Sequence, residues 1–172
     1  MMSKSTILLV DAGVVIEAFR VGAWDVLVSR YNIALSDAIV GESIFYKDDE
    51  EKRYDIDLSG YVDSGKIQVI SVSVADVYKF RDGIGATVFE RIDFGEMTLL
   101  YHLFEHISDE MLIASGDGVV YRILGKHAKS EKGVSLEKLL IEIGHPTSKL
   151  KQQFTQKFKD VNCRKGFDDF CV

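Results

Sequence analysis

Four acidic residues stand at positions where a folded sheet would bring them together. Asp11 and Asp117 each follow a short apolar run, Glu42 lies in the segment that leaves another run, and Glu96 begins a helical pattern. The carboxyl ends of parallel strands meet at one edge of a sheet, and the helix that leads back into a strand starts at that edge. We therefore expect these four carboxyl groups to gather at one rim.

Such a cluster of acids indicates a particular chemistry. Four carboxylates in one small cleft repel one another, so they either take up protons or hold cations. Carboxylate oxygens are hard ligands that suit Mg²⁺ or Mn²⁺. One or two such ions would activate a water and stabilise the charge that develops on a phosphodiester. The pattern therefore favours metal-assisted phosphodiester hydrolysis.

Each of the four acids also has a structural alternative. Asp11 and Asp117 are placed to cap the helices that follow them, because a side-chain oxygen there accepts hydrogen bonds from the first helical N–H groups. Glu96 in a first helical turn would interact favourably with the helix dipole. Glu42 would be a solvated helix residue. The shared position of the four at one rim favours the site.

The elements that must position these acids follow from the alternation of apolar runs and helical patterns. Runs without strict alternation are typical of strands buried on both faces. Most connections suit crossovers, so we predict an α/β fold with three α/β/α layers around a mainly parallel sheet. The expected strands are 6–10, 32–35, 67–71 and 111–115, and the expected helices are 12–30 with a break near Gly22, 37–46, 73–81, 94–107, 118–127 and 135–144.

The single proline, Pro146, separates a domain at 1–146 from a C-terminal helical appendage at 147–172, which is not expected to be an independent domain. Residues 47–66 carry a mixed charge cluster and two glycines, so we expect a solvated excursion with room for a small hairpin. Gly83 and Gly85 are expected to break the chain.

The appendage is rich in basic residues. Phe154 and Phe158, at helical spacing, would dock it on the domain and present lysines to a nucleic-acid strand beside the acidic cleft. The alternative, which we favour, is a solvated amphipathic helix that closes the core. The candidate nucleic-acid contacts are Lys149, Lys151, Lys157 and Lys159.

Four sequence blocks resemble the PIN-domain nucleases, which include the VapC-like toxin nucleases. The blocks are ILLVDAGVVIEAF around Asp11, SDAIVGESIFY around Glu42, DFGEMTLLYHL around Glu96 and MLIASGDGVVYRIL around Asp117. The resemblance implies a three-layer α/β/α domain, an acidic pocket for Mg²⁺ or Mn²⁺ formed by these four acids, and single-stranded RNA as substrate. It also implies that Ser115 is a supporting hydroxyl near the phosphate.

The chain departs from the PIN pattern at two positions. PIN nucleases often carry a small hydroxyl residue or Asn after the first acid, where this chain has Ala12-Gly13. Their third acid is frequently Asp, whereas this chain offers Glu96, with Asp93 three residues earlier as a rival.

We therefore expect a divalent-metal-dependent endoribonuclease that cuts single-stranded RNA. A catalytically inactive PIN-like binding or regulatory module is the main alternative, favoured by the missing hydroxyls. A third hypothesis is a toxin held inactive by an antitoxin-like protein partner, and a homodimer is a further candidate assembly.

Composition excludes several other classes. The chain has 172 residues, with 21 Lys and Arg against 27 Asp and Glu, and its net charge of −6 argues against a surface that coats nucleic acid. Two cysteines are too few for a disulfide scaffold. No apolar segment of membrane-spanning length and no secretion signal is visible, so we expect a cytoplasmic protein without a membrane partner.

Overall fold

Four short apolar segments form a parallel sheet in a computed structural model that describes residues 6–42, 44–84 and 92–170. The strands are β1 (Ile7–Val10), β2 (Asn32–Ser36), β5 (Ile67–Ile70) and β6 (Met111–Ala114), in the spatial order β5-β2-β1-β6. Leu8 of β1 is paired with Ile33 on one side and with Leu112 on the other. All three pairings are parallel, as the crossover lengths predict.

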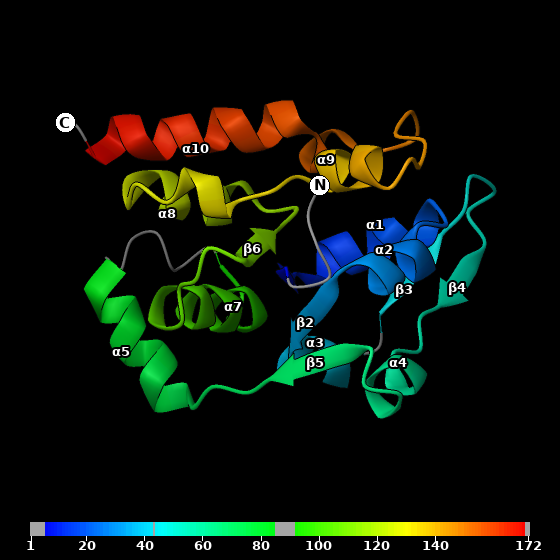
Figure 1. Cartoon of the computed structure of the whole chain (residues 1–172), viewed down its shortest axis with the longest axis horizontal. Helices are drawn as coiled ribbons and strands as arrows, with labels where there is room; N and C mark the ends of the chain where they lie inside the picture. The colour runs from blue at the N-terminus through cyan, green and yellow to red at the C-terminus, as the bar shows by residue number, and fades with distance from the viewer. Residues whose placement is uncertain (1–5, 43, 85–91, 171–172) are drawn as a thin grey trace.

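Helices cover both faces of this sheet, which confirms the predicted three-layer α/β/α architecture. Figure 1 shows α1 (Ala12–Arg20) and α2 (Trp24–Arg30) on one side of the sheet, with α7 (Phe94–Glu105) and α8 (Gly118–Lys126) on the other. Leu8, Leu9 and Val10 are each at most 1% exposed, as expected for a strand with a layer on either side. No helix in the described part of the chain is both long enough and apolar enough to cross a bilayer.

The order of the strands indicates where on the sheet a ligand site is expected. The chain moves outward from β1 to β2 and then β5, and afterwards returns to the opposite side of β1 to form β6. The strand order therefore reverses between β1 and β6. Open α/β sheets bind their ligands outside the carboxyl ends of the strands at such a reversal. Asp11 follows β1 there, and Ser115 to Asp117 follow β6.

The helix predicted at 37–46 is too long. The structure has α3 (Asp37–Gly41), capped by the Ser36 hydroxyl, and a strand begins shortly after it. An antiparallel hairpin of β3 (Phe45–Lys47) and β4 (Arg53–Asp55) follows. At its open end the Ile56 N–H donates to the Ile44 carbonyl at 2.9 Å. A short helix, α4 (Ser59–Asp63), follows the hairpin.

The helix predicted at 73–81 is longer than expected. It is α5 (Val74–Ile84), which continues through Gly83, so this glycine does not break the chain. Gly85 lies outside the described residues. The helix predicted at 94–107 is α7, which ends at Glu105.

Residues after β6 build a helical layer against α8. The 3₁₀ turn η1 (Ser130–Lys132) leads to a single parallel bridge between Gly133 and Ile113, and α9 (Leu136–Glu142) follows. The appendage contains the 3₁₀ turn η2 (Gln152–Phe154) and α10 (Gln156–Phe170), which runs along α8 in Figure 1.

Two glycines allow α8 and α10 to lie in direct backbone contact. A Cβ atom on Gly125 of α8 would overlap the carbonyl oxygen of Cys163, and one on Gly166 of α10 would overlap the carbonyl oxygen of Arg122. Both glycines are buried. The helices therefore approach to a distance that no larger residue would permit at either position.

The segment before α10 is tied to α1 through a buried acid. Glu17 is 1% exposed, forms an ion pair with Arg20, and accepts a hydrogen bond from the Lys151 N–H at 2.9 Å. Arg20 in turn donates to the Lys149 carbonyl. These contacts hold Phe154 against the domain, where it is 3% exposed. Phe154 and Phe158 lie on separate elements, however, because α10 begins only at Gln156.

Candidate functional site

Asp11 connects the ends of the neighbouring strands β1 and β6. Its side chain is 3% exposed, and one carboxyl oxygen, Oδ1, accepts a hydrogen bond from the Val14 N–H at 2.7 Å, which caps α1. The other, Oδ2, accepts from the Ser115 hydroxyl at 2.5 Å and from the Gly116 N–H at 2.9 Å. The predicted capping role is therefore present, and it coincides with a position at the reversal point of the sheet.

Ser115 holds two of the acids in place. Its hydroxyl donates to Asp11 and accepts a hydrogen bond from the Asp117 N–H at 2.8 Å. Asp117 caps α8 by accepting from the Val119 N–H through Oδ1 at 2.7 Å, and no other hydrogen bond in the described chain reaches its carboxyl group. Ser115 is 1% exposed. Its hydroxyl therefore positions the Asp11 side chain and the Asp117 backbone.

Asp93 and Glu96 belong to the first turn of α7. Asp93 caps this helix, since its Oδ1 accepts the Glu96 N–H at 2.8 Å. Glu96 is 9% exposed. Among the described residues, nothing donates a hydrogen bond to the Glu96 carboxyl group, and no cation pairs with it.

The electrostatics of Glu96 show that the acids from three parts of the chain are near one another. Burial, followed by the negative charges of Asp11, Asp93 and Asp117, raises the pKa of Glu96 to about 9. Burial also raises the pKa of Asp11, against the opposing effect of its hydrogen bonds. Because the unfolded chain loses the Glu96 proton near the ordinary glutamate pKa of 4.5, the folded state loses stability as the pH rises from there toward 9, unless a cation compensates.

Glu42 lies at the rim of this cluster. It is the exposed C-cap residue of α3 and lines a cavity of about 70 Å³ together with Asp93 and Glu96. Its charge is not among those that raise the pKa of Glu96. The charges of Asp11, Asp93 and Asp117 thus act on Glu96, and Glu42 shares the small cavity with Asp93 and Glu96.

The chemistry of this donor set suits a hard divalent cation. Each carboxylate offers about four lone-pair sites. Capping uses one site of Asp117 and one of Asp93, and leaves both oxygens of Glu96 free. Even so, no three His, Cys, Asp or Glu side chains within 6–42, 44–84 and 92–170 are arranged closely enough to hold a metal ion. The residues fit Mg²⁺ or Mn²⁺ by type and charge, and binding would require side-chain movement.

Phe154 is a feature of the site that the sequence did not reveal. A Cβ atom on Gly116 would lie only 2.6 Å from the Phe154 ring, and one on Gly13 would lie 3.8 Å from it. The ring therefore packs against the backbone at Gly116, whose N–H donates to Asp11. Gly116 gives this ring room, whereas Ala12-Gly13 supplies no hydroxyl to the site.

The four predicted lysines have different surroundings. Lys149 and Lys151 are exposed, and Lys149 lies 3.4 Å from Asp49. Lys157 lines a cavity that it shares with Asp117. The side chain of Lys159 is only 11% exposed and pairs with Asp160. It is therefore not presented to a nucleic-acid strand at the protein surface.

Two further cations line the cavity beside Lys157 and were not among the predicted residues. Arg122 and Lys165 line the same cavity. Lys157 and Lys165 are eight residues apart on α10, a spacing that brings side chains to one helix face. This spacing could have indicated the two lysines from the sequence. Arg122 could not be found in this way, because only the close contact of α8 and α10 brings it beside them.

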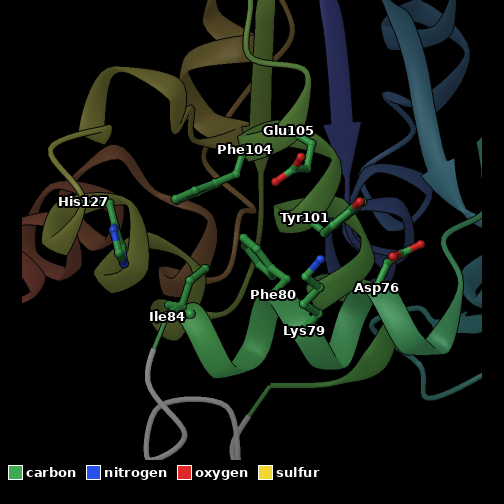
Figure 2. Close-up of a pocket in the computed structure, with 9 residues that line it drawn as sticks. Asp76, Lys79, Phe80, Ile84, Tyr101, Phe104, Glu105 and His127 are labelled. Carbon is green, nitrogen blue, oxygen red and sulfur yellow. The ribbon is translucent and has the colours of Figure 1, made fainter.

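A separate cavity of about 440 Å³ lies between α5 and α7 and contains none of the predicted site residues. Figure 2 shows the rings of Phe80, Tyr101 and Phe104 around it. Phe80 meets the other two rings edge-on, with centroids 5.6 and 5.5 Å away. Its lining combines these rings with the charged side chains of Asp76, Lys79 and Glu105.

Comparisons with known proteins do not place the chain in a family. No family model matches it, and no significant match was found among curated proteins or solved structures.

Proposed function

We propose that this chain is a divalent-metal-dependent endoribonuclease that hydrolyses phosphodiester bonds of single-stranded RNA. The observation that supports this best is the Glu96 carboxyl group, which is buried near Asp11, Asp93 and Asp117 with no cation paired to it in the described chain. The cluster lies where the strand order reverses. A buried acid in such surroundings is costly unless it binds a proton or a cation.

Asp11, Glu96 and Asp117 would hold the ion, with Glu42 closing the set across the cavity and Asp93 as the further acid. A bound Mg²⁺ or Mn²⁺ would lower the pKa of water and neutralise charge on the phosphodiester. Ser115 keeps Asp11 and Asp117 at a fixed separation through its two hydrogen bonds. Phe154 packs against Gly116, whose N–H donates to Asp11.

A catalytically inactive binding module is the second candidate. Two observations favour it, namely that no set of ligands is assembled among the described residues and that Ala12-Gly13 supplies no hydroxyl. In that case the cluster would retain a protonated Glu96, and the chain would bind RNA without cutting it.

Cleavage of a labelled single-stranded RNA by the purified full chain tests the proposal. We expect cleavage with Mn²⁺ or Mg²⁺, loss of cleavage with EDTA, and recovery when Mn²⁺ is added in excess, because the ion supplies the charge that the acids alone cannot. Equal cleavage in EDTA would contradict the proposal. Binding without cleavage under every metal condition would support the inactive module instead.

A further inference from the structure

A cavity of about 490 Å³ lies between α8 and α10, beside the carboxylate cluster. Its volume is within the range of small-molecule sites, roughly 300–1,000 Å³. Asp117 belongs both to its lining and to the group of acids around Glu96. An occupant of this cavity would therefore lie directly next to the proposed site of hydrolysis.

The cavity is positively charged in a chain that is negative overall. It is lined by three cations, Arg122, Lys157 and Lys165, against the single acid Asp117. Neither lysine forms an ion pair with any part of the chain that the structure describes, whereas Lys159 and Arg164 on the same helix do. The net charge of the whole chain is −6. Cations that have no carboxylate partner in the described chain are available to an anionic ligand.

Hydrogen bonds fix the orientation of the Arg122 side chain in this cavity. Its Nε donates to the Asn162 side-chain oxygen at 3.1 Å, and Asn162 is itself fixed by donating to the Phe158 carbonyl at 2.9 Å. Asn162 is 4% exposed and lies against Gly118, where a Cβ atom would lie 2.6 Å from its oxygen. The terminal nitrogens of Arg122 donate to no described residue. A planar guanidinium with free N–H groups matches the oxygens of a phosphate.

The rest of the lining is suited to a base. Phe158 and Val161 add an aromatic ring and an apolar side chain beside the two lysines. Single-stranded nucleic acids bind proteins by a combination of cations that contact the phosphates and aromatic side chains on which bases stack. A nucleoside phosphate has both parts, and the cavity offers a partner for each.

We infer that the cavity between α8 and α10 holds one nucleotide of a single-stranded RNA, adjacent to the nucleotide at the carboxylate cluster, with Arg122, Lys157 and Lys165 at its phosphate. This inference deepens the proposed nuclease function. An RNA strand is favoured over a free nucleotide because the cavity and the cluster share Asp117. One continuous RNA can therefore reach both.

The test measures binding of a short labelled single-stranded RNA to the full chain by fluorescence anisotropy in EDTA, so that cleavage plays no part. The double variant Lys157→Ala/Lys165→Ala should bind roughly tenfold more weakly at low salt. Its slope of log affinity against log salt should fall by up to about 0.7, since both lysines lie at one phosphate and each neutralised phosphate on a single strand contributes about 0.7. Both lysines are exposed helix residues, so alanine should leave the fold intact.

The matched control is Lys138→Ala/Arg164→Ala, which removes the same charge from exposed helix positions outside the cavity. It should change the affinity by less than about twofold. Equal loss in the two double variants, or no loss in either, would overturn the inference, even if the chain cleaves RNA. A clearly larger loss in Lys157→Ala/Lys165→Ala than in the control would support it, even if the chain never cleaves.

Competition with a nucleoside monophosphate distinguishes the two sources of the ligand. We expect the free nucleotide to displace the RNA only at concentrations far above those of a competing unlabelled strand. If the free nucleotide competes as well as the strand, and does so only when Lys157 and Lys165 are present, the cavity is a site for a small nucleotide and the assignment to RNA is wrong.

Discussion

Replacing Asp117 with asparagine should reduce the metal-dependent cleavage rate by more than about a hundredfold, because outer partners of metal ligands alone account for about 10–100-fold. The amide oxygen can still accept the Val119 N–H bond that caps α8, so the helix should be retained. What is lost is one negative charge beside Glu96. Initial rates with Mn²⁺ and thermal melting of the same preparation measure the two effects separately.

Asp57→Asn is the matched control for this substitution. Asp57 also precedes a helix, and its Oδ1 accepts the Ser59 N–H at 2.9 Å, but it is exposed and does not act on Glu96. This variant should cleave at the wild-type rate. A wild-type rate in Asp117→Asn as well would remove Asp117 from the reaction, and a large drop in melting temperature would show that its role is structural.

Substituting alanine for Gly125 should lower the free energy of unfolding by about 3 kcal/mol or more, at the upper end of what overpacking costs. The added methyl group would overlap the backbone carbonyl of Cys163, and a backbone atom cannot move aside as a flexible side chain can. Gly166→Ala should have a similar effect through the carbonyl of Arg122. Urea unfolding followed by circular dichroism measures both.

Gly60→Ala is the control for the glycine substitutions. Gly60 is also helical, lies at the surface, and has no atom within 4 Å of the position of its Cβ. Alanine there should leave stability unchanged or raise it by about 0.5–1 kcal/mol, since glycine weakens helices. If Gly125→Ala also stayed within about 1 kcal/mol of the wild type, the close contact of α8 and α10 would be wrong.

The sheet could be predicted because its signal is local. Runs such as 7–10 and 111–114 are apolar on consecutive positions, which only a strand covered on both faces requires. The long connections between them exclude hairpins, so the parallel order follows. The acids at the strand ends are local signals too, because a residue that follows a strand and precedes a helix has a defined place at the sheet edge.

The elements that depend on distant contacts were not predictable in the same way. Helix α3 stops at Gly41 because the following residues pair with a strand that begins only at Arg53. The inward position of Lys159 depends on which face of α10 meets α8, and two glycines on different helices decide this. Phe154 covers Gly116 because a buried acid on α1, Glu17, holds the segment before it.

The sequence could indicate which acids stand at the sheet edge, but not their surroundings. The acids Asp11 and Asp117 carry out the capping role that is their structural alternative, and the same oxygens would serve as ligands. Sequence shows that an acid stands before a helix, but not how many of its lone pairs the helix uses. Glu96 differs from the other two, since its carboxyl group caps no helix. Its pKa is raised by burial and by neighbouring charges of the same sign.

The central claim is that these acids surround a divalent cation, and calorimetric titration of the full chain with Mn²⁺ tests it most directly. At about pH 7.5 the Glu96 carboxyl group, with its pKa of about 9, still carries a proton that the ion must displace. Titrations in buffers of different ionisation enthalpy should therefore show release of about one proton per bound ion, and Glu96→Gln should bind more weakly and release fewer. Absence of Mn²⁺ binding, or binding with the same affinity and proton release in Glu96→Gln, would contradict the claim.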